Sequence, residues 1–329
     1  MYRKIMDFLE EWKNEEHRKP LILQGARQVG KTYAILEFGR IHYENVAYFN
    51  FETNPKLNET FEENISPDYL IPILSHIAGQ TIVTEKTLIV FDEIQLCERA
   101  LTSLKYFYEE RPDYHIIVAG SLLGVAVNRA RFSFPVGKVD MKTLYPMDLE
   151  EFMIAMGENS LVDQIKKCFE TNESMPSALH DAAMQLYRQY LVVGGMPECV
   201  MQFAETKDYI LIRHTQDTIL ASYLNDMSKY NNLNEIKKTR LAYDNITVQL
   251  SKKNTRFQYK LIKKGGRASE FENAIEWLCL SGIVSQVYKV EQIRKPLENY
   301  RDIDAFKIYV SDLGLLCAKK DIVANDVLY

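Results

Sequence analysis

The chain has 329 residues, 47% of them hydrophobic and 26% charged, and its formal net charge at pH 7 is −5. This length exceeds a single compact core of ordinary size and predicts two or three domains, and the composition is that of a globular rather than a disordered chain. The net negative charge argues against a protein that coats nucleic acid over its whole surface, but it leaves room for a local basic patch.

Cysteine usage and the amino terminus indicate where the chain works. Its five cysteines form no C-x-x-C pair and its six histidines show no paired spacing, so neither a disulfide framework nor a structural zinc site is expected. The amino terminus turns acidic before any hydrophobic stretch develops, unlike a secretory signal, and no run is long enough to span a membrane. We expect a cytoplasmic protein without a membrane partner.

Short β-type runs alternate with helical patterns over the first half of the chain. Apolar strands of this kind, buried on both faces and separated by helices, predict a parallel sheet in an α/β layer. Between the third and fourth strands, the spacing predicts a helix with Leu101, Leu104 and Tyr108 on one face. The five predicted strands are residues 21–23, 46–51, 88–91, 115–119 and 139–144.

The pattern changes near residue 148, where strand signals stop and helical periodicity begins. From about residue 232 the order becomes helix, helix, helix and then two strands, 283–288 and 305–310, which is the order of a winged helix-turn-helix. Ser269–Glu272 matches a capping box that would start the third of these helices. We therefore predict an α/β domain over 1–148, a helical connector or lid over 149–231, and a winged-helix-like domain over 232–329.

Residues Gly25–Thr32 match the pattern G-x-x-x-x-G-K-[ST] of a phosphate-binding loop, known as Walker A. Its two glycines allow a tight turn whose N–H groups cradle an anion, its lysine reaches the β- and γ-phosphates, and its hydroxyl coordinates Mg²⁺. A chance glycine turn is the alternative, but the motif follows a predicted strand and opens a helix, as the mechanism requires. The predicted nucleotide-binding residues are Gly25, Gln28, Val29, Gly30, Lys31, Thr32 and Tyr33.

Asp92 and Glu93 end the third apolar strand, in the manner of a Walker B motif. Asp92 is predicted to hold Mg²⁺ together with Thr32, and Glu93 to orient a water for attack on the γ-phosphorus. The alternative to a catalytic role is that Glu93 is simply an acidic residue at the start of a helix. The cofactors implied are ATP and Mg²⁺.

An added glutamate after the Walker B aspartate is typical of the P-loop ATPases whose sheet has the strand order 5-1-4-3-2. In that class the fourth strand is inserted between the Walker A and Walker B strands, and Ser121 at its carboxyl end would sense the γ-phosphate. A helix cap is an equally good interpretation of Ser121. Arg129 and Arg131 follow as candidate arginine fingers, acting in cis or from a neighbouring subunit of a homo-oligomer, with a solvated basic turn as the alternative. Lys31, Glu93 and Ser121 are thus the predicted catalytic residues.

At this point the sequence resembles the bacterial and archaeal AAA-type ATPases that carry a carboxy-terminal domain of unknown function. The resemblance implies an ATPase core, a helical connector and a winged-helix module, which in longer members precedes a nuclease-like fold. Since the chain ends at Tyr329, we expect that fold to be absent or truncated, and we expect no nucleic-acid cleavage. The matching blocks are Gly25–Thr32, Phe91–Gln95, Ala119–Ser121, Ser133–Val139, Leu144–Met147, Glu151–Phe152, Gly194–Glu198 and Tyr309–Leu316.

A basic stretch between residues 251 and 267 carries seven positive side chains and no acidic one. Phe257 and Tyr259 are interleaved with them, and such density would attract phosphates with a marked salt dependence. A solvated face used for packing or protein contacts is the alternative. The candidate DNA contacts are Lys252, Lys253, Arg256, Lys260, Lys263, Lys264 and Arg267.

Two functions follow from these patterns. In the first, the chain is an ATPase whose Mg-dependent hydrolysis drives a conformational change of the winged-helix module. In the second, it is a nucleotide-controlled switch with slow hydrolysis, whose winged helix presents DNA or a protein partner.

Overall fold

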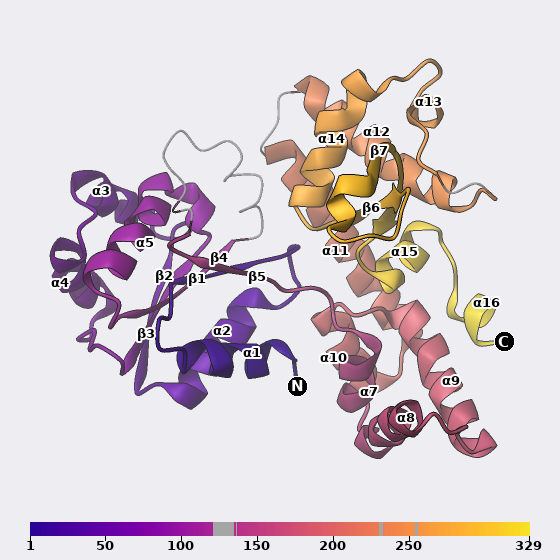
Figure 1. The fold of residues 1–329 in the computed structure, drawn as a ribbon, viewed down its shortest axis with the longest axis horizontal. Coiled ribbons are helices and arrows are strands. Elements are labelled where there is room, and N and C mark those ends of the chain that lie inside the picture. The colour runs from indigo at the N-terminus through magenta and orange to yellow at the C-terminus, as the bar shows by residue number, and fades with distance from the viewer. Residues whose placement is uncertain (121–134, 136, 230–232, 254–255) are drawn as a thin grey trace. The chain divides into compact units, whose positions relative to one another are not determined.

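The structure is a computed structural model of the chain, and it describes all residues except 121–134, 136, 230–232 and 254–255. The described residues form two compact units (Figure 1). The first comprises residues 2–145, and the second comprises residues 146–329 with Met1.

The first unit is built on a five-stranded sheet with the order β2-β3-β4-β1-β5, in which every neighbouring pair is parallel. The predicted order is therefore confirmed, with β4 inserted between β1 and β3. Each predicted strand is present within one or two residues of its expected bounds. The strands are β1 Leu21–Gln24, β2 Asn45–Asn50, β3 Thr87–Asp92, β4 His115–Gly120 and β5 Asp140–Thr143.

Helices cover both faces of this sheet, with α1 and α2 on one side and α3, α4 and α5 on the other (Figure 1). Alternate side chains of a strand point to opposite faces, so a continuous apolar strand such as β3, buried at every position, packs against both helix layers. The helices are α1 Ile5–Lys13, α2 Lys31–His42, α3 Lys56–Glu63, α4 Pro67–Ala78, the 3₁₀ turn η1 Ile94–Leu96 and α5 Glu98–Glu110.

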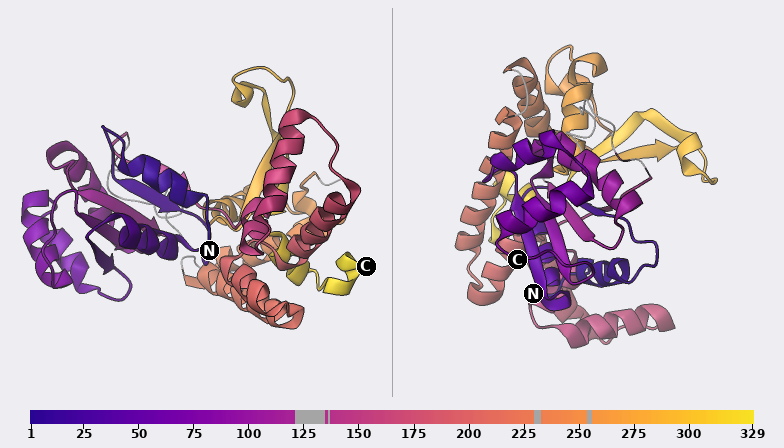
Figure 2. Two further views of the ribbon diagram at one scale, coloured as in Figure 1. Left: turned by 90° about the horizontal axis from the view of Figure 1, so that it is seen from below. Right: turned by 90° about the vertical axis from the view of Figure 1, so that its left-hand side faces the viewer.

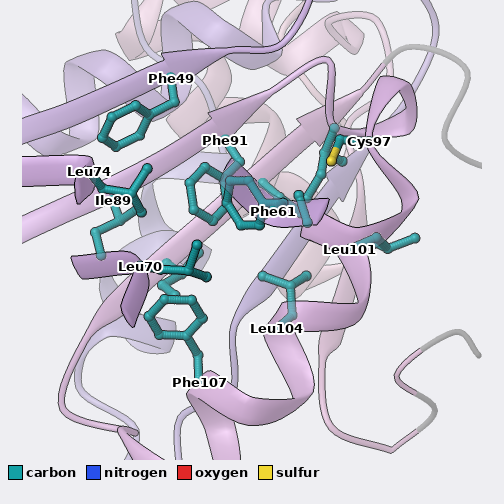
Figure 3. Packing of buried hydrophobic residues seen from close by; sticks show 14 of the residues in the cluster. Phe49, Phe61, Leu70, Leu74, Ile89, Phe91, Cys97, Leu101, Leu104 and Phe107 are labelled. Carbon is teal, nitrogen blue, oxygen red and sulfur yellow. The ribbon is translucent and has the colours of Figure 1, made fainter. Parts of the chain in front are cut away.

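A cluster of aromatic rings fills the layer between the sheet and α3–α5 (Figure 3). Phe91 of β3 lies at its centre, with its ring centroid 5.6 Å from that of Phe61 and 5.8 Å from that of Phe49. From α5, Leu101 and Leu104 are buried as predicted. The third buried side chain of this helix face is Phe107 rather than Tyr108, because the position three residues after Leu104 faces the sheet. This packing holds the carboxyl end of β3 in place.

The second unit is mostly helical from its start. Asp148 caps the first helix through a reciprocal pair, in which its side chain accepts from the Glu151 N–H at 2.9 Å and its own N–H donates to the Glu151 carboxylate at 3.2 Å. Further helices follow up to residue 280, with no strand among the residues of this range that the structure describes. The helices of this range are α7 Leu149–Ala155, α8 Asn159–Thr171, α9 Ser177–Val193, α10 Pro197–Thr206, α11 Tyr209–Lys229, α12 Leu233–Leu250, α13 Tyr259–Ile262 and α14 Ala268–Leu280.

Two antiparallel strands follow α14, side by side in Figure 2. The capping box predicted at Ser269–Glu272 is wrong: α14 begins at Ala268, its N-cap is Arg267 without a side-chain cap, and Ser269 lies inside the first turn. A serine there cannot serve the first amides of the helix. The remaining elements are β6 Val284–Val290, the 3₁₀ turn η2 Leu297–Tyr300, β7 Arg301–Val310, α15 Leu313–Lys319 and α16 Ala324–Leu328.

Three of the blocks that carry the family resemblance meet inside the second unit. The buried Asp312 caps α15 by accepting from the Leu315 N–H at 2.8 Å, and it also accepts from the Gly195 N–H at 2.6 Å. A Cβ on Gly194 would lie 2.3 Å from the Asp312 carboxylate, and one on Gly195 would lie 1.9 Å from the Met147 carbonyl oxygen. We call Met147, Gly194, Gly195 and Asp312 the glycine junction; only glycine allows its close backbone approach.

Among the helices of the described residues, none is long and apolar enough to cross a membrane.

Candidate nucleotide site

The loop between β1 and α2 has the strained backbone that a phosphate-binding loop requires. Gly25 (φ 148°), Gln28 (φ 66°) and Gly30 (φ 89°) all have positive φ values, and α2 starts directly after Gly30. A Cβ on Gly25 would lie 2.2 Å from the Leu144 carbonyl oxygen, so this glycine is required by contact as well as by conformation. Val29 is fully buried beneath the loop. The successive backbone N–H groups of this turn form a ready anion site at a helix N-terminus.

Lys31 closes the loop on itself. Its ammonium donates to the carbonyl oxygens of Gly25 and Ala26, each at 2.9 Å, and its side chain is 7% exposed. Burial lowers the pKa of Lys31 to about 8, and the nearby carboxylates of Glu93 and Asp92 oppose that shift. The lysine is therefore a preformed positive group whose carbonyl contacts can be exchanged for phosphate oxygens.

Asp92, at the carboxyl end of β3, accepts hydrogen bonds from two hydroxyl groups. Its Oδ2 accepts from the Thr32 hydroxyl at 2.8 Å and from the Tyr48 hydroxyl at 2.7 Å, and Asn50 donates to the Tyr48 oxygen at 3.2 Å. Because β2 and β3 are parallel neighbours, Tyr48 and Asp92 reach the same edge of the sheet. Burial chiefly raises the pKa of Tyr48, to about 12, so this hydroxyl stays protonated and donates to the carboxylate.

Glu93 lies at a sharp bend directly after β3. Its backbone is left-handed (φ 52°), an unusual conformation for a glutamate, and it stands immediately before η1. Gln95 donates its amide N–H to the Glu93 carboxylate, while the Gln95 carbonyl oxygen is buried with no hydrogen-bond partner among the described residues. Burial raises the pKa of Glu93, and the hydrogen bond from Gln95 opposes that shift. The acidic helix start considered from the sequence is reduced to a single 3₁₀ turn.

The donor set around Asp92 fits Mg²⁺. The Thr32 hydroxyl and the Asp92 carboxylate already lie within hydrogen-bond distance of each other. In nucleotide sites, Mg²⁺ binds hard oxygen ligands from one or two side chains, and phosphate and water complete its coordination. The described residues contain no group of three or more His, Cys, Asp or Glu side chains arranged for a metal.

Not every predicted site residue lies within this arrangement. Tyr33 is on α2 and is 62% exposed. Ser121, the predicted γ-phosphate sensor, and Arg129 and Arg131, the candidate arginine fingers, lie outside the described residues. Their roles stay predictions.

Sequence reasoning missed two side chains of the site. Tyr48 faces Asp92 only because β2 pairs with β3 in one register, which no local pattern displays. For Gln95 the sequence holds only a weak indication: it is the last residue of the Phe91–Gln95 block, which matches the family.

In the second unit, the basic side chains of this stretch are exposed, whereas Phe257 is buried and Tyr259 is half-buried. All seven predicted DNA contacts are exposed. Phe257 is 6% exposed; its ring stacks on that of Phe306 with centroids 5.4 Å apart and meets that of Tyr259 edge-to-face at 5.3 Å, so it fills the core instead of offering a surface for bases. On the neighbouring α14, the exposed face carries Glu272 and Glu276.

Comparisons with known proteins agree with this architecture. Residues 17–153 match an AAA domain family, and residues 184–326 match a domain of unknown function, DUF8612. No curated protein matches the chain.

Among solved structures, the Walker-type ATPase of Pyrococcus abyssi is 14% identical, with 97% of this chain and 95% of that chain covered and a TM-score of 0.58. The ORC2 protein of Aeropyrum pernix, solved in ADPNP–ADP complexes, is 12% identical over 99% and 93% of the two chains, with a TM-score of 0.43. The first likeness shows a shared fold over nearly the whole chain. The two family matches identify an AAA-type domain followed by a carboxy-terminal domain of unknown function, which is the combination that the resemblance predicted.

Proposed function

We propose that this chain binds ATP with Mg²⁺ and hydrolyses it, and that hydrolysis drives a conformational change of a winged-helix module in the second unit. One observation supports this chemistry. At one edge of the sheet, the Thr32 hydroxyl donates to the Asp92 carboxylate, next to the buried Lys31 and to Glu93 with its left-handed backbone. These are four groups with distinct tasks in phosphoryl transfer.

Lys31 and the loop supply the phosphate site. The loop amides and the start of α2 attract the anion, and the Lys31 ammonium leaves the Gly25 and Ala26 carbonyls for the β- and γ-phosphate oxygens. Since those carbonyls already hold the ammonium in the loop, the site loses little conformational freedom when nucleotide binds.

Thr32 and Asp92 are the residues that would hold Mg²⁺. When bound, the ion neutralises charge on the β- and γ-phosphates. Tyr48 keeps the Asp92 carboxylate in one orientation through its 2.7 Å hydrogen bond, so the carboxylate is prepared before the nucleotide arrives.

Glu93 orients the attacking water. A half-buried carboxylate with a raised pKa is a better proton acceptor than a fully exposed one, and the left-handed backbone of Glu93 turns the side chain out of the strand direction. The Gln95 amide occupies that carboxylate in the structure. We therefore assign Gln95 to holding Glu93 until nucleotide and water take its place.

The winged helix is supported by the order of elements. Three helices, α12 to α14, precede an antiparallel hairpin, β6 and β7. We propose this module as the part that responds to the nucleotide, with domain bounds at 1–148, 149–231 and 232–329.

The test compares the purified wild-type chain with Glu93→Gln in ATP binding and in steady-state hydrolysis. Glu93→Gln keeps the size of the side chain and removes its basicity, so ATP affinity should stay within a few-fold while turnover falls about 10²–10⁴-fold. Glu98→Gln, on the first turn of α5, serves as the matched control and should turn over normally. Normal turnover by Glu93→Gln would remove Glu93 from its assigned role.

A second candidate function, a nucleotide-controlled DNA-binding switch with slow hydrolysis, is favoured by the exposure of all seven basic side chains between Lys252 and Arg267. Reversing Lys260, Lys263 and Lys264 to glutamate should then lower DNA affinity and flatten its dependence on salt. Reversing Lys166, Lys167 and Lys207, which lie outside that stretch, is the control. The acidic exposed face of α14 predicts that any such binding lacks sequence specificity, and unchanged affinity after the first reversal would exclude DNA.

A further inference from the structure

Arg3 is buried beneath the phosphate-binding loop although it lies at the amino terminus. Its side chain is 5% exposed, and its guanidinium reaches two backbone carbonyls far apart in the sequence of the first unit. It donates to the Val29 carbonyl at 3.0 Å and to the Tyr145 carbonyl at 2.9 Å. A planar guanidinium holds two acceptors in a fixed geometry, which a lysine cannot do.

The first of these contacts sets the direction of a peptide in the loop. Val29 and Gly30 share one trans peptide plane, in which the Val29 carbonyl and the Gly30 N–H point in opposite directions. Arg3 fixes the Val29 carbonyl on its own side, so the Gly30 N–H faces away from Arg3. That N–H is one of the groups expected to bind phosphate.

The second contact lies on the last residue of the first unit. Residues 144–147, which we call the connector, leave β5 along the base of the loop: the Leu144 N–H donates to the Gln24 carbonyl at 2.8 Å. Tyr145 follows and accepts from Arg3, and the second unit begins at the next residue, Pro146.

Within the second unit, the end of the connector is held as firmly. The Met147 N–H donates to the Gly195 carbonyl at 2.7 Å, and the Met147 carbonyl accepts from the Tyr190 hydroxyl at 2.8 Å. Gly195 is in turn fixed by the buried Asp312. Four consecutive residues thus join the base of the phosphate loop to the glycine junction with hydrogen bonds at both ends.

We propose that Arg3 is a positioning residue that orients the Gly30 N–H for phosphate and transmits the state of the loop to the connector. This inference rests on the proposed function, since it requires a nucleotide in the loop. When phosphate draws on the Gly30 N–H, the Val29 carbonyl moves with it, and Arg3 carries that displacement to Tyr145. The chain itself then delivers it to Met147 and the glycine junction.

The experiment measures Mg·ADP affinity by titration calorimetry, and hydrogen exchange of the full chain with and without Mg·ADP. In the wild type, Mg·ADP should slow exchange in the connector and in residues 190–196. Arg3→Met, which keeps the side chain's bulk without its donors, should weaken Mg·ADP binding about tenfold or more and abolish the response at residues 190–196. Arg40→Met is the control, because Arg40 is exposed and pairs with Glu37 on the same helix.

A second variant keeps the proposal testable should Arg3→Met unfold. Inserting Gly-Ser-Gly between Tyr145 and Pro146 leaves Arg3 and the loop intact but slackens the connector. It should bind Mg·ADP like the wild type and lose the response at residues 190–196. Wild-type affinity in Arg3→Met, or a full response in the insertion variant, would overturn the inference, and so would a wild type that binds Mg·ADP without any response. A wild type that fails to bind Mg·ADP would instead refute the proposed function.

Discussion

The nucleotide site and the glycine junction each contain a carboxylate withdrawn from solvent: Glu93 is half-buried, Asp312 is buried, and the two have opposite kinds of hydrogen-bond partner. Asp312 lies at the N-terminus of α15 and accepts from the backbone N–H groups of Gly195 and Leu315. Glu93 is held by one side-chain amide, that of Gln95, which has its own carbonyl oxygen left without a partner among the described residues. Burial raises the pKa of both.

The difference separates architecture from chemistry. A carboxylate that accepts from backbone amides keeps these partners, because leaving the amides unpaired would cost free energy. A carboxylate held by one movable side chain can change partners at small cost. The first unit therefore keeps the Glu93 carboxylate available for a ligand, whereas the second unit uses the Asp312 carboxylate to fix its backbone.

The largest expected effect would test the ligand side of this comparison. Lys31→Ala removes the ammonium assigned to the β- and γ-phosphates and should weaken ATP binding at least about 100-fold, measured by calorimetry. The same variant removes a buried ammonium, so its melting temperature without nucleotide should equal or exceed that of the wild type. A large loss of thermal stability would place Lys31 with the structural groups.

The next effect would test the structural side. Gly194→Ala forces a Cβ to within 2.3 Å of the Asp312 carboxylate and should cost roughly 3 kcal/mol in the unfolding free energy of the second unit. Gly157→Ala is the matched control, since Gly157 also has a positive φ but open space around it, and should cost about 1 kcal/mol. Equal losses in urea titrations would mean that the junction is not tightly packed.

A smaller effect concerns pH. With the pKa of Lys31 lowered to about 8, its ammonium loses its proton above that pH, and ATP affinity should fall up to tenfold per pH unit from pH 8 to 9.5. Stability without nucleotide should move the other way: between the folded pKa and the higher unfolded one the unfolded chain binds more protons, so Lys31 contributes increasing stability as pH rises. ATP affinity that stays level to pH 9.5 would contradict this assignment.

The smallest effect would sharpen the role of Tyr48. Tyr48→Phe removes the hydrogen bond that orients Asp92 and should raise the Mg²⁺ concentration needed for half-maximal turnover about 3- to 10-fold, with kcat at saturating Mg²⁺ little changed. Tyr108→Phe, on the partly exposed side of α5, should leave both quantities unchanged. An unaltered Mg²⁺ dependence in Tyr48→Phe would show that Asp92 needs no such support.

The sequence by itself determined the parts of this protein that are local. Gly25–Thr32 specify their loop because glycine alone tolerates its dihedrals and close contacts, and the continuous apolar run of β3 specifies a buried strand that delivers Asp92 and Glu93 to one edge. The sheet order followed from the class that an added glutamate after Asp92 indicates, and the structure confirms it.

The tertiary structure alone decided which distant residues meet. Arg3 reads as an ordinary charge at the amino terminus, and Tyr48 as a residue in the middle of a strand, until folding brings them to Val29 and Asp92. Phe257 lies among lysines and arginines in a pattern that suggests base stacking, yet it packs against Phe306, a partner 49 positions further along the chain. A local pattern carries the preferences of a segment, but strand register and core packing set its partners, and those arise from the whole chain at once.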